Sequence, residues 1–270
     1  MKKIHFMSGL PRSGSTLLTS ILNQHPKIYS SHQTDLINII NKIKLEYPDY
    51  ESVMAGTRVN SSNQIIEGIG QLFYSDIDKE IIIDKNRGWS TLHNIKLAGL
   101  FSNPVKIIFP YRKPIEILAS FISLAEKNPN NFIDKNMIAE DFLPYYYMPR
   151  NDARCEWLMQ NRNQISFGLF GLRLAQSKEY KDNIHIVEYD KLCKNPQEEM
   201  NKIYNFLEID SYSHNFKNII NTEKQNDMEV YGVPDLHKIK TNISASSINP
   251  YDILSEYVIN KYSREGILEQ

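Results

Sequence analysis

The chain has 270 residues, with 31 basic and 32 acidic side chains and a formal net charge of -1. Hydrophobic residues make up 41% of it, which is enough for a packed core and excludes disorder as the general state. The balanced charge argues against a general nucleic-acid or anionic-membrane binder, because such proteins carry a basic excess. The two cysteines, Cys155 and Cys193, provide neither a disulfide framework nor a metal-ligand cluster.

The expected location and domain organisation follow from the absence of special segments. No apolar run approaches about 18 residues, so the sequence predicts no membrane span. The first expected strand begins at Lys3, which leaves no room for a signal peptide, and we expect a cytoplasmic protein. Without an internal repeat or a low-complexity linker, residues 1–270 are expected to form a single domain.

Short apolar runs alternate with amphipathic patterns along the chain. The expected strands are residues 3–8, 80–84, 105–110 and 183–189. The expected helices are residues 14–24, 34–47, 61–73, 89–99, 114–127, 152–177 and 196–207, with a last helical pattern from Tyr251 onward. Apolar strands alternating with helices indicate a central parallel sheet of about five strands with helices on both faces, which is a three-layer α/β fold.

The most informative segment runs from His5 to Leu18, where a strand, a glycine-bearing loop and a helix follow one another. This arrangement points backbone N–H groups at a phosphate. Gly9 and Gly14 have the spacing of a Walker A loop, but Ser15 stands where that loop has its lysine. Arg12, inside the loop, is the cation instead.

Residues 11–16 read Pro-Arg-Ser-Gly-Ser-Thr and resemble the loop of sulfotransferases that use 3′-phosphoadenosine 5′-phosphosulfate (PAPS). The arginine makes the loop similar to the tyrosylprotein branch and its bacterial members. The resemblance implies the P-loop NTPase-like sulfotransferase fold and sulfuryl transfer from PAPS to an acceptor hydroxyl. Adenosine 3′,5′-bisphosphate would be the product, and no metal would be required. It assigns the 5′-phosphosulfate to Arg12, Ser13, Gly14, Ser15 and Thr16, with Arg12 also catalytic.

Further nucleotide contacts come from the same resemblance. Arg112 ends an apolar strand and Ser120 lies about two helical turns later, the spacing that the family uses for the 3′-phosphate. Tyr189 occupies the position of a nucleotide-contacting tyrosine, although a core tyrosine explains it equally well. Lys238 is expected to fold over the nucleotide phosphates, with a solvated basic loop as the alternative. For Lys240 the two interpretations are level.

Residues 84–87 read Asp-Lys-Asn-Arg after an apolar strand. The resemblance places a cation here against the sulfuryl group, and Lys85 and Arg87 are both candidates. Asp84 is a possible ion-pair partner for either one. The strand ending in Asp84 also matches a Walker B strand, which supports an alternative P-loop kinase or NTPase that uses Mg²⁺.

The general base is the point at which the sequence departs from the family. Gln33 stands where the animal tyrosylprotein enzymes have a glutamate, and glutamine cannot take a proton from a phenol. His32 and Asp35 are the two candidate substitutes, and they rank almost level. Asp35 also fits a role at the first turn of the following helix. The departure at Gln33 favours a second alternative, a nucleotide-binding pseudoenzyme that acts as an interaction module.

The acceptor is not specified by the sequence. The resemblance favours a peptide tyrosine, while a carbohydrate or small molecule stays open. The acceptor cleft is expected to come from residues 45–75 and 125–155. Nucleic acid is not an expected partner, and the oligomeric state is open, with a homodimer among the options.

Overall fold

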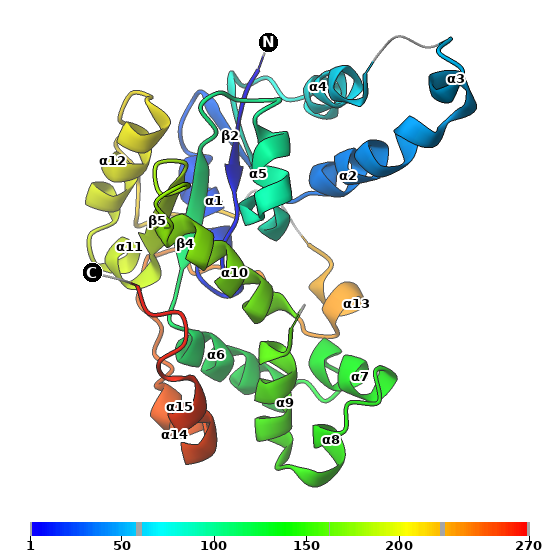
Figure 1. Ribbon diagram of the computed structural model, residues 1–270. Helices are drawn as coiled ribbons and strands as arrows, with labels where there is room; N and C mark the ends of the chain where they lie inside the picture. The colour runs from blue at the N-terminus through cyan, green and yellow to red at the C-terminus, as the bar shows by residue number, and fades with distance from the viewer. Residues whose placement is uncertain (1, 58–60, 162, 222–224, 269–270) are drawn as a thin grey trace.

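The computed structural model describes residues 2–57, 61–161, 163–221 and 225–268. Five strands form one sheet in the order β2-β3-β1-β4-β5 (Figure 1). Their bounds are β1 Lys3–Met7, β2 Ile28–Gln33, β3 Ile81–Lys85, β4 Ile107–Tyr111 and β5 Ile184–Glu188. All neighbouring strands are parallel, so the carboxyl ends of the strands meet at one edge of the sheet. The expected three-layer α/β fold is confirmed.

Helices occupy most of the remaining chain. The α-helices are α1 Ser15–Leu22, α2 Leu36–Glu46, α3 Glu51–Met54, α4 Ser62–Phe73, α5 Leu92–Ala98, α6 Pro114–Lys127, α7 Phe132–Ala139, α8 Pro144–Tyr147, α9 Arg150–Met159, α10 Gln164–Gln176, α11 Tyr189–Lys194, α12 Pro196–Leu207, α13 Asp227–Tyr231, α14 Pro250–Ile253 and α15 Glu256–Tyr262. Two short 3-10 helices are η1 Tyr47–Asp49 and η2 Arg87–Ser90. Among the described residues, none of these helices combines the length and apolarity that a bilayer span requires.

The sheet separates two hydrophobic clusters, because successive strand side chains point to opposite faces. Phe6 and Ile82 belong to the cluster that packs against α2, α4, α5 and α10. Met7 and Ile83, each one residue further along, belong to the cluster that packs against α1 and α12. Near-continuous apolar strands are therefore buried on both faces, as expected for a parallel sheet.

The edge strand β2 was not among the strands expected from the sequence. Its sequence is Ile-Tyr-Ser-Ser-His-Gln, so it carries no continuous apolar run. Polar side chains stabilise it instead: Asn23 Oδ1 accepts from the Ser30 N–H at 2.7 Å, and Asn23 Nδ2 donates to the Ser30 carbonyl at 2.9 Å. Ser31 Oγ accepts from the Lys85 N–H of the neighbouring strand at 2.8 Å. These partners satisfy buried polar groups that an apolar pattern cannot predict.

The single helix expected over residues 152–177 is wrong. The structure has two helices, α9 and α10, because the backbone turns extended at Gln160, with ψ at 146°. The side-chain amide of Asn163 donates to the Trp157 carbonyl near the end of α9. Asparagine side chains compete in this way for backbone groups and favour helix ends.

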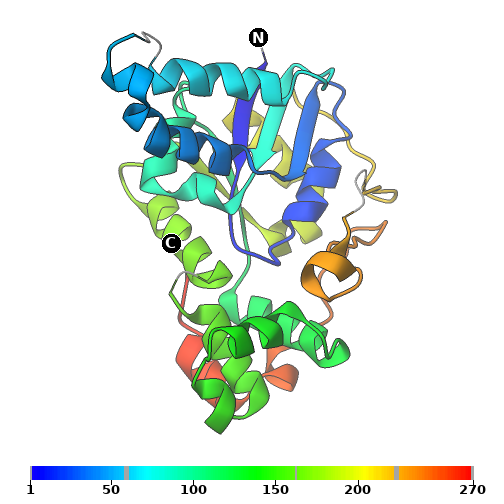
Figure 2. The same ribbon diagram turned by 90° about the vertical axis from the view of Figure 1, so that its right-hand side faces the viewer.

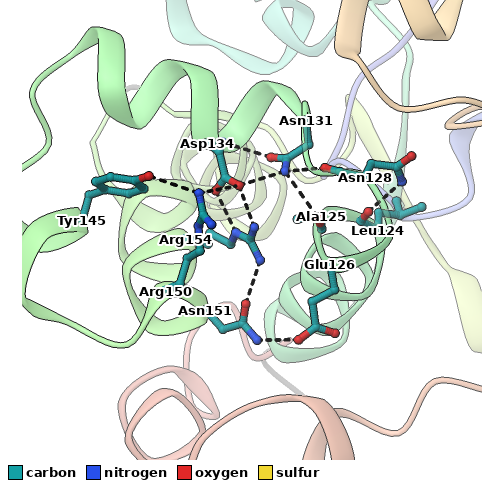
Figure 3. A network of polar contacts seen from close by, with 10 residues as sticks. All are labelled: Leu124, Ala125, Glu126, Asn128, Asn131, Asp134, Tyr145, Arg150, Asn151 and Arg154. Carbon is teal, nitrogen blue, oxygen red and sulfur yellow. Dashed lines mark hydrogen bonds and ion pairs between the residues drawn. The ribbon is translucent and has the colours of Figure 1, made fainter.

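Helices α6 to α9, with α14 and α15, extend beyond the carboxyl edge of the sheet (Figures 1 and 2). A buried polar network joins α7 to α9 (Figure 3). Arg154 binds both carboxylate oxygens of Asp134, at 2.8 and 2.6 Å, and Asn131 Nδ2 donates to the same carboxylate at 3.0 Å. A paired, two-pronged contact of this kind fixes the helices in one arrangement. Helices α7 and α9 thus form a helical support beside the carboxyl edge of the sheet.

Candidate functional site

The loop between β1 and α1 is wound tightly at the carboxyl edge of the sheet. Three of its residues have positive φ: Gly9 at 127°, Arg12 at 55° and Gly14 at 86°. A Cβ at Gly9 would lie 2.5 Å from the Pro110 carbonyl oxygen, and one at Gly14 would lie 2.6 Å from the Tyr189 ring. Both glycines are therefore required by backbone conformation and by space.

The N-terminus of α1 opens into a cavity. Gly14 is the N-cap and supplies no side-chain hydrogen bond, and the first turn carries no acidic residue. Gly14, Ser15 and Thr16 line a cavity of about 350 Å³. Unpaired N–H groups and the positive end of the helix dipole favour an anion at such a place.

Two arginines from distant parts of the chain meet at this cavity. Arg12 comes from the loop, and its Nε donates to Ser120 Oγ on α6 at 3.3 Å. Arg112 follows β4, pairs with Glu116 at 3.0 Å, and lies over the Tyr189 ring at 4.9 Å from its centroid. All of these except Glu116 line the cavity. The structure thus brings Arg12, Arg112, Ser120 and Tyr189 together, although they span 177 residue positions of sequence.

Burial affects the ionisable groups of this cavity. It lowers the pKa of Arg12 from its ordinary value, and the nearby charge of Arg112 acts in the same direction. Burial raises the pKa of Tyr189 to about 12. Two adjacent, partly desolvated guanidinium groups repel each other, so a bound polyanion would relieve this repulsion.

Residues 236–240 and 242–248, near the C-terminus, also line the cavity. Arg12 Nη1 donates to the Leu236 carbonyl, and the Tyr189 hydroxyl donates to the Ser244 carbonyl at 3.4 Å. Lys238 lies on the rim, with its side chain 70% exposed and 3.2 Å from Asp235. Lys240 donates to Ser244 Oγ at 3.1 Å. Both lysines line the cavity, Lys238 from a solvated position.

A second, smaller cavity of about 160 Å³ adjoins the first. Gln33, Lys85 and Arg87 contribute to its walls. Lys85 is the last residue of β3 and only 8% exposed. Arg87 lines both cavities, so it lies at their junction. Burial lowers the pKa of its guanidinium. Lys85 and Arg87, the two candidate cations for the sulfuryl group, therefore both line the second cavity, and Arg87 also lines the first.

Asp84 is a buried structural carboxylate. Its oxygens accept hydrogen bonds from Thr34 Oγ1 at 2.7 Å, from Trp89 Nε1 at 2.6 Å and from the Tyr74 hydroxyl. Its side chain is fully buried, and burial raises its pKa. These three donors, rather than Lys85 or Arg87, are the partners that the structure gives to Asp84. The side chain lies inside the protein, away from the described walls of both cavities.

Neither candidate base, His32 nor Asp35, is among the described residues that line the two cavities, although His32 contacts Gln225 of the second. His32 is buried within β2, with Nδ1 3.3 Å from the side-chain nitrogen of Gln225. Asp35 is the exposed N-cap of α2 and accepts from Asn38 Nδ2 at 2.9 Å. The structure therefore does not bring these two side chains to the cavity that Gln33 reaches.

The sequence interpretation missed a histidine that does reach it. His237 lines both cavities, and Asp227 holds its ring Nδ1 at 2.6 Å. His237 stands in a segment that the sequence singled out only for its lysines. Its partner is ten positions earlier, a spacing that matches no short motif. The sequence signal that could have indicated His237 was its position beside Lys238 and near Lys240.

The sequence model of the sulfotransferase domain matches residues 3–251. The chain therefore belongs to the sulfotransferase domain family and is a transferase of that family. No curated protein matches the sequence significantly.

Solved structures show the same fold. The sulfotransferase domain of the Synechococcus PCC 7002 olefin synthase is 20% identical with a TM-score of 0.53, and the alignment covers 94% of this chain and 87% of that one. The sulfotransferase domain from the curacin biosynthetic pathway is 14% identical with a TM-score of 0.54, covering 97% and 98%. These similarities confirm the P-loop-like sulfotransferase fold.

The positive φ of Gly14 and its close contact with Tyr189 allow a prediction about the loop. Gly14→Ala is expected to lower the free energy of unfolding by about 2–5 kcal/mol, because left-handed strain and a clash with Tyr189 add. Gly56→Ala is the matched control, since Gly56 also has positive φ but open space around it. It should cost only about 1–2 kcal/mol of strain. Urea unfolding measures both variants, and equal losses would contradict the close packing of Tyr189 on the loop.

Proposed function

We propose that this protein transfers a sulfuryl group from PAPS to an acceptor hydroxyl and releases adenosine 3′,5′-bisphosphate. The observation that carries the proposal is the pairing of an uncapped helix N-terminus with Arg12 and Arg112 around one cavity. A nucleotide with phosphate groups at two positions needs such separated anion sites. Membership in the sulfotransferase domain family supports the same reaction.

The residues divide into two anion sites within this proposal. Arg12, Ser13, Gly14, Ser15 and Thr16 would hold the 5′-phosphosulfate, with backbone N–H groups on the oxygens. Arg112 and Ser120 would hold the 3′-phosphate, and the Tyr189 ring and Lys238 would complete the nucleotide site. Ser13 Oγ is already bonded to the Leu10 carbonyl at 2.5 Å, so its contribution would be the backbone N–H.

The reaction breaks the bond between sulfur and the bridging oxygen while the acceptor oxygen bonds to sulfur. Negative charge would then develop on the 5′-phosphate, and the Arg12 guanidinium, which lines the cavity, would neutralise it. Arg87 and Lys85 would stabilise the sulfuryl oxygens from the second cavity. Positioning and fixed charge would supply most of the catalysis, as in phosphoryl transfer.

The acceptor and the setting extend the proposal. We infer a peptide tyrosine as the first acceptor to test, followed by carbohydrates and small phenols. The whole chain would act as one domain in the cytoplasm, without a required metal. The position of Asp84 supports this choice over a Mg²⁺-dependent kinase or NTPase, since its carboxylate is buried against Thr34, Tyr74 and Trp89.

Ligand-dependent melting tests the nucleotide part of the proposal. Adenosine 3′,5′-bisphosphate at a hundred times its Kd, in EDTA, should stabilise the protein by about 2.7 kcal/mol, or roughly 5–10 °C in Tm. The arginine sites account for binding without a cation. ATP with Mg²⁺ is the control ligand. Stabilisation by Mg-ATP alone would instead establish the NTPase alternative.

A further inference from the structure

His237 is fixed by two hydrogen bonds to one carboxylate. Its ring Nδ1 lies 2.6 Å from Asp227 Oδ1, and its backbone N–H donates to Asp227 Oδ2 at 2.8 Å. The Asp227 side chain is only 8% exposed, so this contact is protected from water. Backbone and ring are thereby held by the same group, which sets the direction of the imidazole.

This contact determines which ring nitrogen carries the proton. An ionised carboxylate accepts hydrogen bonds and cannot donate them, so Nδ1 must be the protonated nitrogen of the neutral imidazole. The Nε2 atom then keeps its lone pair. No described residue forms a hydrogen bond to Nε2 in the structure, and the ring is 22% exposed. The imidazole therefore presents a basic nitrogen.

The position of the ring is the second observation. His237 lines both cavities, together with Ser15, Arg87 and Tyr231. The described walls of the two cavities contain no aspartate or glutamate. The other ionisable side chains of these walls are arginines, lysines and tyrosines. His237 is thus the one imidazole, and the one side chain with a free basic ring nitrogen, among the described wall residues.

We propose that His237 is the catalytic base of this site and that Asp227 is its positioning residue. The inference rests on the proposed sulfuryl transfer and deepens it. As the acceptor oxygen bonds to sulfur, its proton passes to His237 Nε2, and the electron pair of the broken sulfur–oxygen bond leaves with the bisphosphate. The imidazolium then releases the proton to solvent, so the net products are the sulfate ester, the bisphosphate and one proton.

The surrounding fold explains how a residue near the C-terminus is held at the sheet edge. Tyr231, at the end of α13, packs against the Phe132 ring of α7 at 5.9 Å and against the His237 ring at 5.6 Å. Gly232 has positive φ, and a Cβ there would clash with the Asn130 carbonyl. The adjacent Asn131 belongs to the network that locks α7 to α9 (Figure 3). The base is therefore anchored to the helical support.

Charged groups around the ring set its titration. Burial lowers the pKa of His237 from its ordinary value, Asp227 opposes this shift, and the charges of Lys85 and Arg12 reinforce it. Arg87 lies on the same walls and acts in the same direction as the other cations. The lowered pKa favours the neutral imidazole, which can accept a proton. Activity should fall as the pH drops through the pKa of His237.

His237→Gln is the direct test, with p-cresol and p-nitrophenol as acceptors. The variant should lose about 10²–10⁴-fold in kcat on p-cresol, whose hydroxyl is protonated. It should lose much less on p-nitrophenol, which ionises without help near neutral pH. Its affinity for adenosine 3′,5′-bisphosphate should stay within about threefold, and the acidic limb of the pH profile should vanish. His93→Gln is the matched control, because His93 is exposed on α5.

Asp227→Asn tests the positioning role through a different readout. Removal of the carboxylate charge lowers the pKa of His237, so the acidic limb should move to lower pH while kcat falls about tenfold or more. A purely structural role would change stability and leave the limb in place.

Long-range proton–nitrogen NMR spectra test which ring nitrogen of His237 carries the proton, and they need no acceptor. The His237 signals, assigned by their loss in His237→Gln, should show the tautomer protonated at Nδ1. An Nε2-protonated tautomer would overturn the proposal, as would wild-type rates of His237→Gln on p-cresol. Absence of transfer by the wild-type protein, with the expected tautomer present, would refute the sulfuryl transfer rather than the geometry of the base.

Discussion

Arg12→Ala is expected to reduce kcat for sulfuryl transfer by about a thousandfold or more while the protein stays folded. The guanidinium lines the same cavity as the N-terminus of α1, where charge would develop on the leaving phosphate in the proposed reaction, and arginines that neutralise such charge contribute about 10³–10⁵-fold. Its side chain is polar and half-buried, outside the two hydrophobic clusters that stabilise the sheet. Transfer of sulfur-35 from PAPS and the Tm of the variant measure the two effects separately.

Two further variants sharpen this prediction. Arg12→Lys keeps the charge but loses the planar group that reaches both Ser120 and Leu236, so it should recover only part of the rate. Arg173→Ala removes an exposed arginine of α10 and should behave as the wild type. If Arg12→Ala stays within tenfold of the wild-type kcat, Arg12 has no part in the transition state.

Arg112→Ala is expected to weaken binding of adenosine 3′,5′-bisphosphate by about 10- to 100-fold, because a charged hydrogen bond contributes about 1.5–3 kcal/mol. The side chain is only 7% exposed and faces the cavity beside Ser120. At saturating nucleotide, kcat should change much less than Kd, since the arginine would contact the part of the nucleotide that does not react. Titration calorimetry measures the affinity.

The matched ligand for this variant is adenosine 5′-monophosphate, which lacks the 3′-phosphate. Its affinity should be the same for Arg112→Ala and for the wild type. Lys113→Ala, which removes the exposed neighbouring cation, is the control for charge alone. An equal loss of affinity for both nucleotides would show that Arg112 supports the cavity as a whole and does not recognise the 3′-phosphate.

The fold was predictable wherever it depends on local apolar patterns. The strands β1, β3, β4 and β5 are short apolar runs between turn signals, and all four were expected. The strand β2 was missed because its serines are satisfied by polar partners, Asn23 and the distant Lys85, and not by an apolar pattern. The split between α9 and α10 occurs where the backbone is extended at Gln160 and Asn163 donates to the Trp157 carbonyl, and a hydrophobic periodicity does not register such contacts.

The candidate site likewise has parts that a local sequence pattern predicts and parts that it does not. The loop around Arg12 is contiguous in sequence, so its geometry could be predicted from glycine spacing and helix position. The pair Arg112 and Ser120 was expected from the family resemblance, which gave a strand end and a serine about two helical turns later. The contact between Asp227 and His237 depends instead on how the C-terminal segment crosses the sheet edge, which no local pattern encodes. The sequence offered His32 and Asp35 as candidate bases because they flank Gln33, the position of the family's glutamate.

The most direct test of the proposed function is the transfer of sulfur-35 from PAPS to an acceptor panel. Tyrosine peptides, carbohydrates and phenols are incubated with the wild-type protein and with Arg12→Ala. We expect labelled sulfate ester on at least one hydroxyl acceptor with the wild type, and about a thousandfold less with Arg12→Ala. Tight binding of adenosine 3′,5′-bisphosphate without label on any acceptor would contradict the proposal and identify the protein as a nucleotide-binding pseudoenzyme.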